Sequence, residues 1–161
     1  MTTTTTPTAT AFLNPRVIAL AHYAARAVLE KVLARHGVTF QQSVTLRLAA
    51  VAEGPVERDR IVADVVGALK IDAAEAHSVV DELISAGLLA HHETPHASPH
   101  ESPQVRITDV GRELFETTST ETAPVTARVY ADIPAEDLAV AGRVLSLITE
   151  RADAEFAALA G

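Results

Sequence analysis

The order of the residues that start and stop helices between positions 37 and 113 constrains the fold of this chain more than any other feature. Thr39 and Gln42 have the spacing of a capping box, in which each side chain satisfies a backbone donor of the first helical turn. A helix is therefore predicted to begin near Phe40. It is predicted to stop at Gly54-Pro55, because proline cannot continue a helix and glycine permits a left-handed cap.

Two more helix signals follow at close spacing. Asp59 is a candidate cap for a second helix, and Asp72 is a candidate cap for a third helix that ends at Gly87. Apolar residues recur at helical spacing in both, namely Ile61, Val62, Val65, Val66 and Leu69 in the second and Ala76, Val79, Val80, Leu83 and Ile84 in the third. Two short helices joined by so tight a turn predict a helix-turn-helix, whose second helix enters the major groove of a duplex.

A hairpin wing is predicted directly after these helices. Residues 88–92 and 104–107 are short extended runs on either side of a loop rich in Pro, His and Ser. Thr108 is the predicted cap of the next helix, and Asp109 is well placed at its positive end. The predicted fold class is therefore mainly α with a small β wing, that is, a winged helix-turn-helix lobe that binds a nucleic-acid duplex, with helical regions on either side.

Three segments in this order resemble the signatures of the MarR family of bacterial winged helix-turn-helix transcriptional regulators. They are Gly37-Val38-Thr39-Phe40-Gln41-Gln42 with Leu46 and Leu48, then Asp81-Glu82-Leu83 with Gly87-Leu88-Leu89, then Ile107-Thr108-Asp109-Val110-Gly111-Arg112-Glu113-Leu114. The resemblance runs from Asn14 to Leu159. It implies a homodimer in which the N- and C-terminal helices of two protomers interlock. It also implies a small effector, often aromatic or anionic, that binds between those helices and the lobe and weakens DNA binding.

The sequence predicts four parts, which are a disordered tail over residues 1–11, an N-terminal dimerisation helix over 12–36, the winged lobe over 37–108 and C-terminal dimerisation helices over 109–161. Pro15 suits a first helical turn, Pro124 is expected to bend the helix after the wing, and Pro134 opens the last helix. The apolar faces of the first and last helices exceed what one lobe covers, which favours a dimer over a monomeric helical domain. A two-fold dimer is expected to bind a pseudo-palindromic operator.

Charge is the main difficulty for DNA binding. The net charge is -8, whereas counterion release rewards Lys and Arg at a DNA interface. No Lys or Arg lies between Lys70 and Arg106, although several acidic residues do. The absence of cysteine excludes a disulfide, a thiolate metal site and the thiol-based redox sensing of some MarR-family members. No apolar run has membrane-spanning length and residues 1–10 lack a secretory signal, so a cytoplasmic location with no membrane partner is expected.

Two groups of residues are predicted to contact DNA. Phosphate contacts are expected from cations around the first two helices of the lobe and at the close of the wing, namely Arg47, Arg58, Arg60, Lys70 and Arg106. Base or phosphate contacts are expected on the face of the third helix that points away from its apolar stripe, namely at Ala74, Glu75, His77 and Ser78. The alternatives are surface ion pairs for the cations and an ordinary solvated face for the helix.

The wing carries histidines where the MarR resemblance implies arginines. His91, His92, His96 and His100 have the chemistry of zinc or nickel ligands, and Glu93 or Glu101 would complete a site, but the spacing matches no defined metal signature. Three interpretations stay open. The protein is a metal-responsive regulator, the wing is a solvated polar loop, or protonated histidines supply the positive charge that is missing near phosphates.

The sequence contains no catalytic constellation, since it has no Gly-rich phosphate loop, no nucleophile elbow and no helical pair of His ligands. The protein is therefore not expected to be an enzyme or to need a cofactor. The effector pocket that the resemblance implies is expected at His22, Arg26, Phe40 and Arg47. A winged-helix protein-interaction module that has lost DNA binding is a further alternative, because it would explain the acidic third helix.

Overall fold

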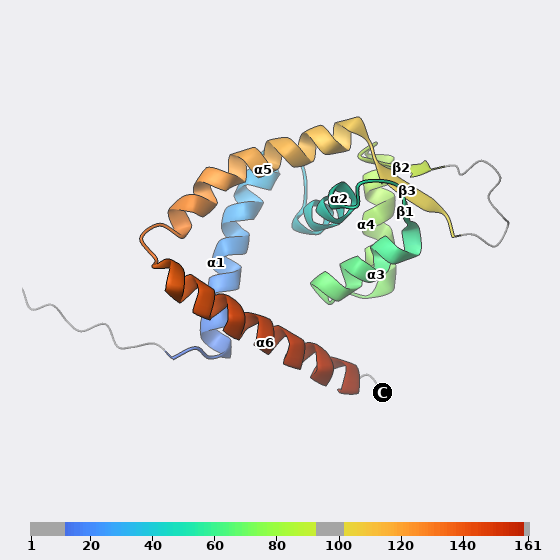
Figure 1. The fold of residues 1–161 in the computed structure, drawn as a ribbon. Coiled ribbons are helices and arrows are strands. Elements are labelled where there is room, and N and C mark those ends of the chain that lie inside the picture. Colours follow the sequence, from blue (N-terminus) through green and yellow to red (C-terminus); the bar gives the residue numbers. More distant parts are fainter. Residues whose placement is uncertain (1–11, 93–101, 160–161) are drawn as a thin grey trace, which may run out of the picture. The chain divides into compact units, whose positions relative to one another are not determined.

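The computed structural model describes residues 12–92 and 102–159 (Figure 1). The predicted tail over residues 1–11 and the loop with His96 and His100 lie outside the described residues. The chain divides into two units, one ending at Thr122 and one beginning at Ala123, and each is described by itself. The described residues are mainly helical with one small three-stranded antiparallel sheet, which confirms the predicted fold class.

The first helix, α1 (Pro15–Leu33), begins where the sequence predicted. The Asn14 side chain caps this helix by accepting a hydrogen bond from the Arg16 N–H at 3.0 Å. A short 3-10 helix, η1 (Ala34–His36), follows, and Gly37 ends it in the left-handed conformation with a φ of 67°. Glycine adopts this conformation without the steric cost that a side chain would add.

The capping box predicted at Thr39 and Gln42 is present at the start of α2 (Phe40–Val51). The Gln42 N–H donates to Thr39 Oγ1 at 3.2 Å, and the Thr39 N–H donates to Gln42 Oε1 at 3.0 Å. The predicted end at Gly54-Pro55 is wrong, because the helix stops at Val51 and Glu53 takes the left-handed conformation with a φ of 52°. The proline disfavours a helical conformation in the residue before it, so the chain leaves the helix earlier.

The second helix of the lobe, α3 (Arg58–Leu69), begins one residue before its predicted cap. Glu57 occupies the cap position without a side-chain cap bond, so the expectation that Asp59 caps this helix is wrong. Asp59 lies in the first turn instead, where a carboxylate interacts favourably with the helix dipole. The start of α3 is fixed from outside the helix, since the Arg58 N–H donates to the Pro103 carbonyl at 2.8 Å.

The third helix of the lobe, α4 (Ala73–Ser85), matches the prediction at both ends. Asp72 caps it through a hydrogen bond that the Glu75 N–H donates to Oδ1 at 2.7 Å. Gly87 follows its last turn in the left-handed conformation with a φ of 71°. Lys70 begins the turn between α3 and α4 with a φ of 56°. The predicted helix-turn-helix is therefore confirmed.

The wing contains one strand more than the sequence predicted (Figure 1). β2 (Leu89–His92) and β3 (Gln104–Ile107) pair in the antiparallel sense, with His91 opposite Val105. The additional strand, β1 (Val56–Glu57), pairs with the other edge of β3, which gives the strand order β1-β3-β2. Two residues are too few to show the alternation by which a strand is recognised. This short strand joins the start of α3 to the wing.

The core of the first unit lies between α2, α3, α4 and the sheet. Its deeply buried side chains come from all of these elements and include Leu46, Ile61, Val65, Val80, Leu83, Leu89 and Val105. Full burial of an aliphatic side chain stabilises a fold by about 1.5–3 kcal/mol. The shared core, more than any propensity within one helix, therefore holds α4 in place.

Thr108 connects the wing to the next helix, α5 (Asp109–Val129). Its hydroxyl donates to the Gly87 carbonyl at 2.7 Å and accepts a hydrogen bond from the Gly111 N–H at 3.0 Å, which confirms the predicted cap. Gly111 is buried, and a side chain at this position would collide with the Leu88 carbonyl. The close approach of α5 to the turn after α4 therefore requires glycine.

Farther along α5, Glu121 joins this helix to the end of the N-terminal helical segment. One carboxylate oxygen lies 3.2 Å from His36 Nε2, and the other lies 3.4 Å from the Arg35 guanidinium. Both partners belong to η1. These contacts attach α5 to the N-terminal segment within the first unit.

The second unit contains the end of α5 and the last helix, α6 (Ala135–Leu159). Pro124 lies inside α5, which confirms the single long helix, while the bend expected there stays a prediction. The Pro134 carbonyl accepts a hydrogen bond from the Asp137 N–H at the start of α6. No residue of α6 is buried. None of the helices in the described part of the chain has the length and apolar character needed to cross a membrane.

Replacing Gly111 with Ala is expected to lower the free energy of unfolding by about 1–3 kcal/mol, because the new Cβ meets a backbone carbonyl that has no room to move. Gly67→Ala in α3 is the matched control. No heavy atom lies within 4 Å of a Cβ at Gly67, so this change should raise the free energy of unfolding by about 0.4–1 kcal/mol. Urea titrations followed by circular dichroism measure both values, and equal effects would contradict the packing argument.

Candidate nucleic-acid interface

The solvent-facing side of α4 is the surface on which base readout was predicted. Its apolar stripe, Ala76, Val79, Val80 and Leu83, is buried in the core. Ala74, Glu75 and Ser78 are exposed, as their predicted role requires, whereas His77 is half-buried. DNA contact by these four residues stays a prediction.

Two glutamines of α2 hold carboxylates of α4. Gln41 Nε2 donates to Glu75 Oε1 at 2.7 Å, and Gln42 Nε2 donates to Glu82 Oε2 at 2.9 Å. Sequence reasoning missed both contacts, because Gln42 was identified only by its capping role and a contact across 40 positions leaves no local signal. Glu75 therefore already accepts a hydrogen bond on the face where base or phosphate contacts were expected.

An ion pair joins the start of α3 to the middle of α4. Arg58 Nη2 lies 2.8 Å from Asp81 Oδ1 and 3.5 Å from the His77 carbonyl oxygen. The hydrogen bond from Arg58 is the main cause that lowers the pKa of the Asp81 carboxyl. Desolvation opposes it, and the nearby charges of Arg58, His77 and His91 add smaller effects that lower the pKa further. A lowered pKa keeps the carboxylate charged at every pH above its ordinary value of 3.8, so the pair persists through the neutral range.

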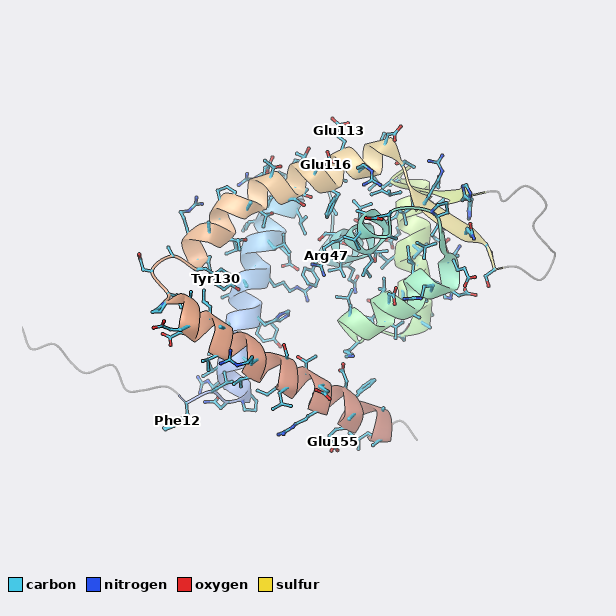
Figure 2. The ribbon with its side chains drawn as sticks, in the orientation of Figure 1. Phe12, Arg47, Glu113, Glu116, Tyr130 and Glu155 are labelled. Carbon is cyan, nitrogen blue, oxygen red and sulfur yellow. The ribbon has the colours of Figure 1, made fainter. Side chains whose placement is uncertain are left out.

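The other predicted phosphate ligands are mostly exposed. Arg60 pairs with Asp64 on the next turn of α3 at 3.3 Å, although 70% of its side chain is exposed. Arg47 is exposed on α2 (Figure 2), and Arg106 is exposed on β3 opposite Ala90. Exposed ion pairs contribute little to stability, so the pairing of Arg60 does not prevent a phosphate contact. These contacts, and the one expected from exposed Lys70, stay predictions.

The two described histidines of the wing differ in exposure. His91 is exposed and His92 is half-buried, in agreement with the expected alternation along a strand. Among the residues that the structure describes, no three His, Asp or Glu side chains lie close enough together to hold a metal ion. His96 and His100 lie outside that part of the chain, so metal binding by the wing loop stays a prediction.

The structure brings together two of the four residues predicted to bind an effector. The Arg26 guanidinium of α1 lies 4.5 Å above the centre of the Phe40 ring at the start of α2, and Glu30 pairs with Arg26 at 2.8 Å. His22 packs edge-on against Tyr23 at 5.6 Å, and Arg47 is exposed. Within this structure the guanidinium has the Phe40 ring and the Glu30 carboxylate as its partners, and effector binding by the four residues stays a prediction.

The α3-turn-α4 pair, with the three-stranded wing behind it, defines the chain as a winged helix-turn-helix protein. No family model and no curated protein matches the sequence. Its class is therefore established by the fold.

Solved structures of MarR-family proteins share this fold over most of their length. A MarR-family transcriptional regulator from Rhodococcus sp. RHA1 superposes with a TM-score of 0.68 at 19% identity, covering 83% of this chain and 91% of that chain. A mutant MarR from E. coli complexed with operator DNA gives 0.67 at 16% identity, with coverage of 83% and 91%. BpsR from Bordetella bronchiseptica, whose DNA binding is regulated by 6-hydroxynicotinic acid, gives 0.67 at 21% identity, with coverage of 89% and 98%. The chain has the MarR fold.

Proposed function

We propose that this protein is a homodimeric transcriptional regulator that binds a pseudo-palindromic DNA operator and has no enzymatic activity. The observation that carries the proposal is the structure of the lobe. Asp72 caps α4, the apolar stripe of α4 packs in the core, and the strands of the wing follow it. The same fold in E. coli MarR has been solved with operator DNA. In this arrangement the second helix enters the major groove, and the wing reaches the neighbouring backbone.

Positive charge on the lobe is sparse, which determines how strongly DNA affinity should depend on salt. Arg58 is paired with Asp81, and Arg60 is paired with Asp64. Within residues 12–92 and 102–159, Arg47 and Arg106 form no ion pair. Because each neutralised phosphate contributes about 0.9 to the slope of log K against log salt, affinity should depend only weakly on ionic strength.

Arg106→Ala is expected to lower this slope by about one for each protomer and to weaken binding to all sequences alike, because a phosphate contact carries no sequence information. Arg60→Ala should act in the same way. Fluorescence anisotropy on a fragment recovered by genomic pull-down, at several salt concentrations, measures the slope. Arg143→Ala in α6 is the control for net charge and should leave the slope unchanged.

Unaltered slopes in both Arg60→Ala and Arg106→Ala would contradict the phosphate contacts. A folded dimer that binds no duplex even at low salt would favour a protein-interaction module. That second function is favoured by the acidic residues Glu75, Asp81 and Glu82, which are exposed on α4.

The proposed homodimer rests on apolar side chains that one chain leaves uncovered. The exposed fractions along α6 are 40% for Leu145, 39% for Ile148 and 59% for Phe156, and Leu20 and Tyr23 of α1 are exposed by 57% and 65%. Exposed apolar surface of this extent marks a protein interface. A second copy of the chain with the same two helices would cover it and would present two α4 helices to the two halves of an inverted repeat.

Leu145→Asp or Ile148→Asp is expected to dissociate the dimer, because a carboxylate in the apolar interface costs several kcal/mol. Sedimentation equilibrium at micromolar concentration measures the mass. Arg143→Asp places the same carboxylate on α6 at a position that is already charged, so it should leave the dimer intact. A well-folded monomer of the unmodified protein at this concentration would overturn the proposal.

We also propose that a small aromatic carboxylate weakens operator binding by docking at Arg26 and Phe40. The cation over the ring supports this proposal, and BpsR, of the same fold, responds to such an acid. In an anisotropy assay with a panel of aromatic acids, an active compound should lose its effect in Arg26→Gln. It should keep its effect in Arg16→Gln, which removes the same charge from the same helix. An effect that survives in Arg26→Gln would exclude this site.

A further inference from the structure

The contacts of Arg58 meet at the junction of three elements. Its backbone N–H donates to the Pro103 carbonyl just before β3, and its guanidinium reaches Asp81 and the His77 carbonyl on α4. The preceding residues, 56 and 57, pair with β3 as strand β1. One residue at the start of α3 therefore links the wing to the recognition helix.

The exposure of Arg58 differs from that of a phosphate ligand. Only 18% of its side chain is exposed, compared with 70% for Arg60 two residues later. An arginine that binds phosphate presents its donors to solvent, whereas this guanidinium is turned toward α4. Its partner Asp81 is 59% exposed, so Arg58 of α3 is the more buried member of the pair.

Asp81 is the acceptor on α4 that binds the Arg58 guanidinium. Arg58 donates to it from α3 at 2.8 Å, and its own helix carries the His77 carbonyl that the same guanidinium reaches. Ser78 and Ala74 lie three and seven residues before Asp81, so the three positions share one face of the helix. A contact that fixes Asp81 therefore fixes the face that was predicted to contact bases.

We propose that Arg58 is a positioning residue, which holds α4 and the wing in the arrangement that binds DNA and does not itself contact phosphate. This inference rests on the proposed function. For a variant without the Asp81 charge, it predicts a change in DNA affinity opposite to the change that charge alone would cause. Removing the negative charge of Asp81 from a helix that faces DNA would strengthen binding if charge alone mattered. The loss of the positioning contact predicts that binding weakens instead.

The test is a double-mutant cycle with Arg58→Gln, Asp81→Asn and both together, read by operator anisotropy at several salt concentrations. Each single variant should weaken binding roughly tenfold, as expected for the loss of a charge-assisted hydrogen bond. The double variant should be no weaker than either single variant, and the salt slope should stay unchanged in all three. The exchanged pair Arg58→Asp with Asp81→Arg should recover part of the affinity, which a general loss of folding would not allow.

Arg60→Gln is the matched control, because it removes the same charge from the same helix. It should lower the salt slope and show no coupling to Asp81→Asn. Tighter binding by Asp81→Asn, or a lower salt slope in Arg58→Gln, would overturn the positioning role and return Arg58 to the phosphate ligands.

Amide hydrogen exchange separates the failure of this inference from the failure of the proposed function. Without DNA, exchange in α4 and β2 should accelerate in both single variants and no further in the double variant. Unchanged exchange would overturn the positioning role even if the protein binds an operator. Absence of duplex binding by the unmodified protein would instead contradict the proposed function.

Discussion

The hydrogen bonds of Thr108 fix the point at which the wing, the turn after α4 and the long helix α5 meet. Its hydroxyl binds the Gly87 carbonyl after α4 and the Gly111 N–H in the first turn of α5, and its N–H donates to the Leu88 carbonyl. A single residue thereby caps the first turn of α5, whose N–H groups lack partners within the helix, and binds the turn that follows α4. The wing, the turn after α4 and the start of α5 are therefore joined through one side chain within the first unit.

The carboxylates on the exposed face of α4 accept hydrogen bonds from side chains of α2 and α3. Gln41 and Gln42 of α2 hold Glu75 and Glu82, and Arg58 of α3 holds Asp81. These donors reduce the repulsion that free carboxylates would exert on phosphate, although the formal charge remains. In the proposed complex with DNA, few cations are available, so binding would depend more on shape and hydrogen bonding at a well-positioned helix than on counterion release. Accurate placement of α4 then matters more than it would in a strongly basic protein.

The fold was largely predictable because its signals are local. The Thr39 capping box, the Asp72 cap and the left-handed Gly87 each act within four residues, so each is visible in the sequence. Two of the misses, β1 and the start of α3, arose where a distant segment decides the local structure. β1 exists because β3 lies beside it, and α3 begins at Arg58 because the Pro103 carbonyl accepts its N–H. Neither effect has a signal in the residues concerned.

The candidate site was less predictable for the same physical reason. Exposure of Ala74 and Ser78 followed from the helical period, whereas the pairing of Arg58 with Asp81 depends on the packing of two helices. An arginine near a recognition helix has the same sequence signature whether it points to phosphate or to a neighbouring carboxylate. The fraction of its side chain that remains exposed separates the two roles, and that fraction is a property of the packed lobe. Identical residue types at positions 58 and 60 therefore have different surroundings on the same helix, with 18% and 70% of their side chains exposed.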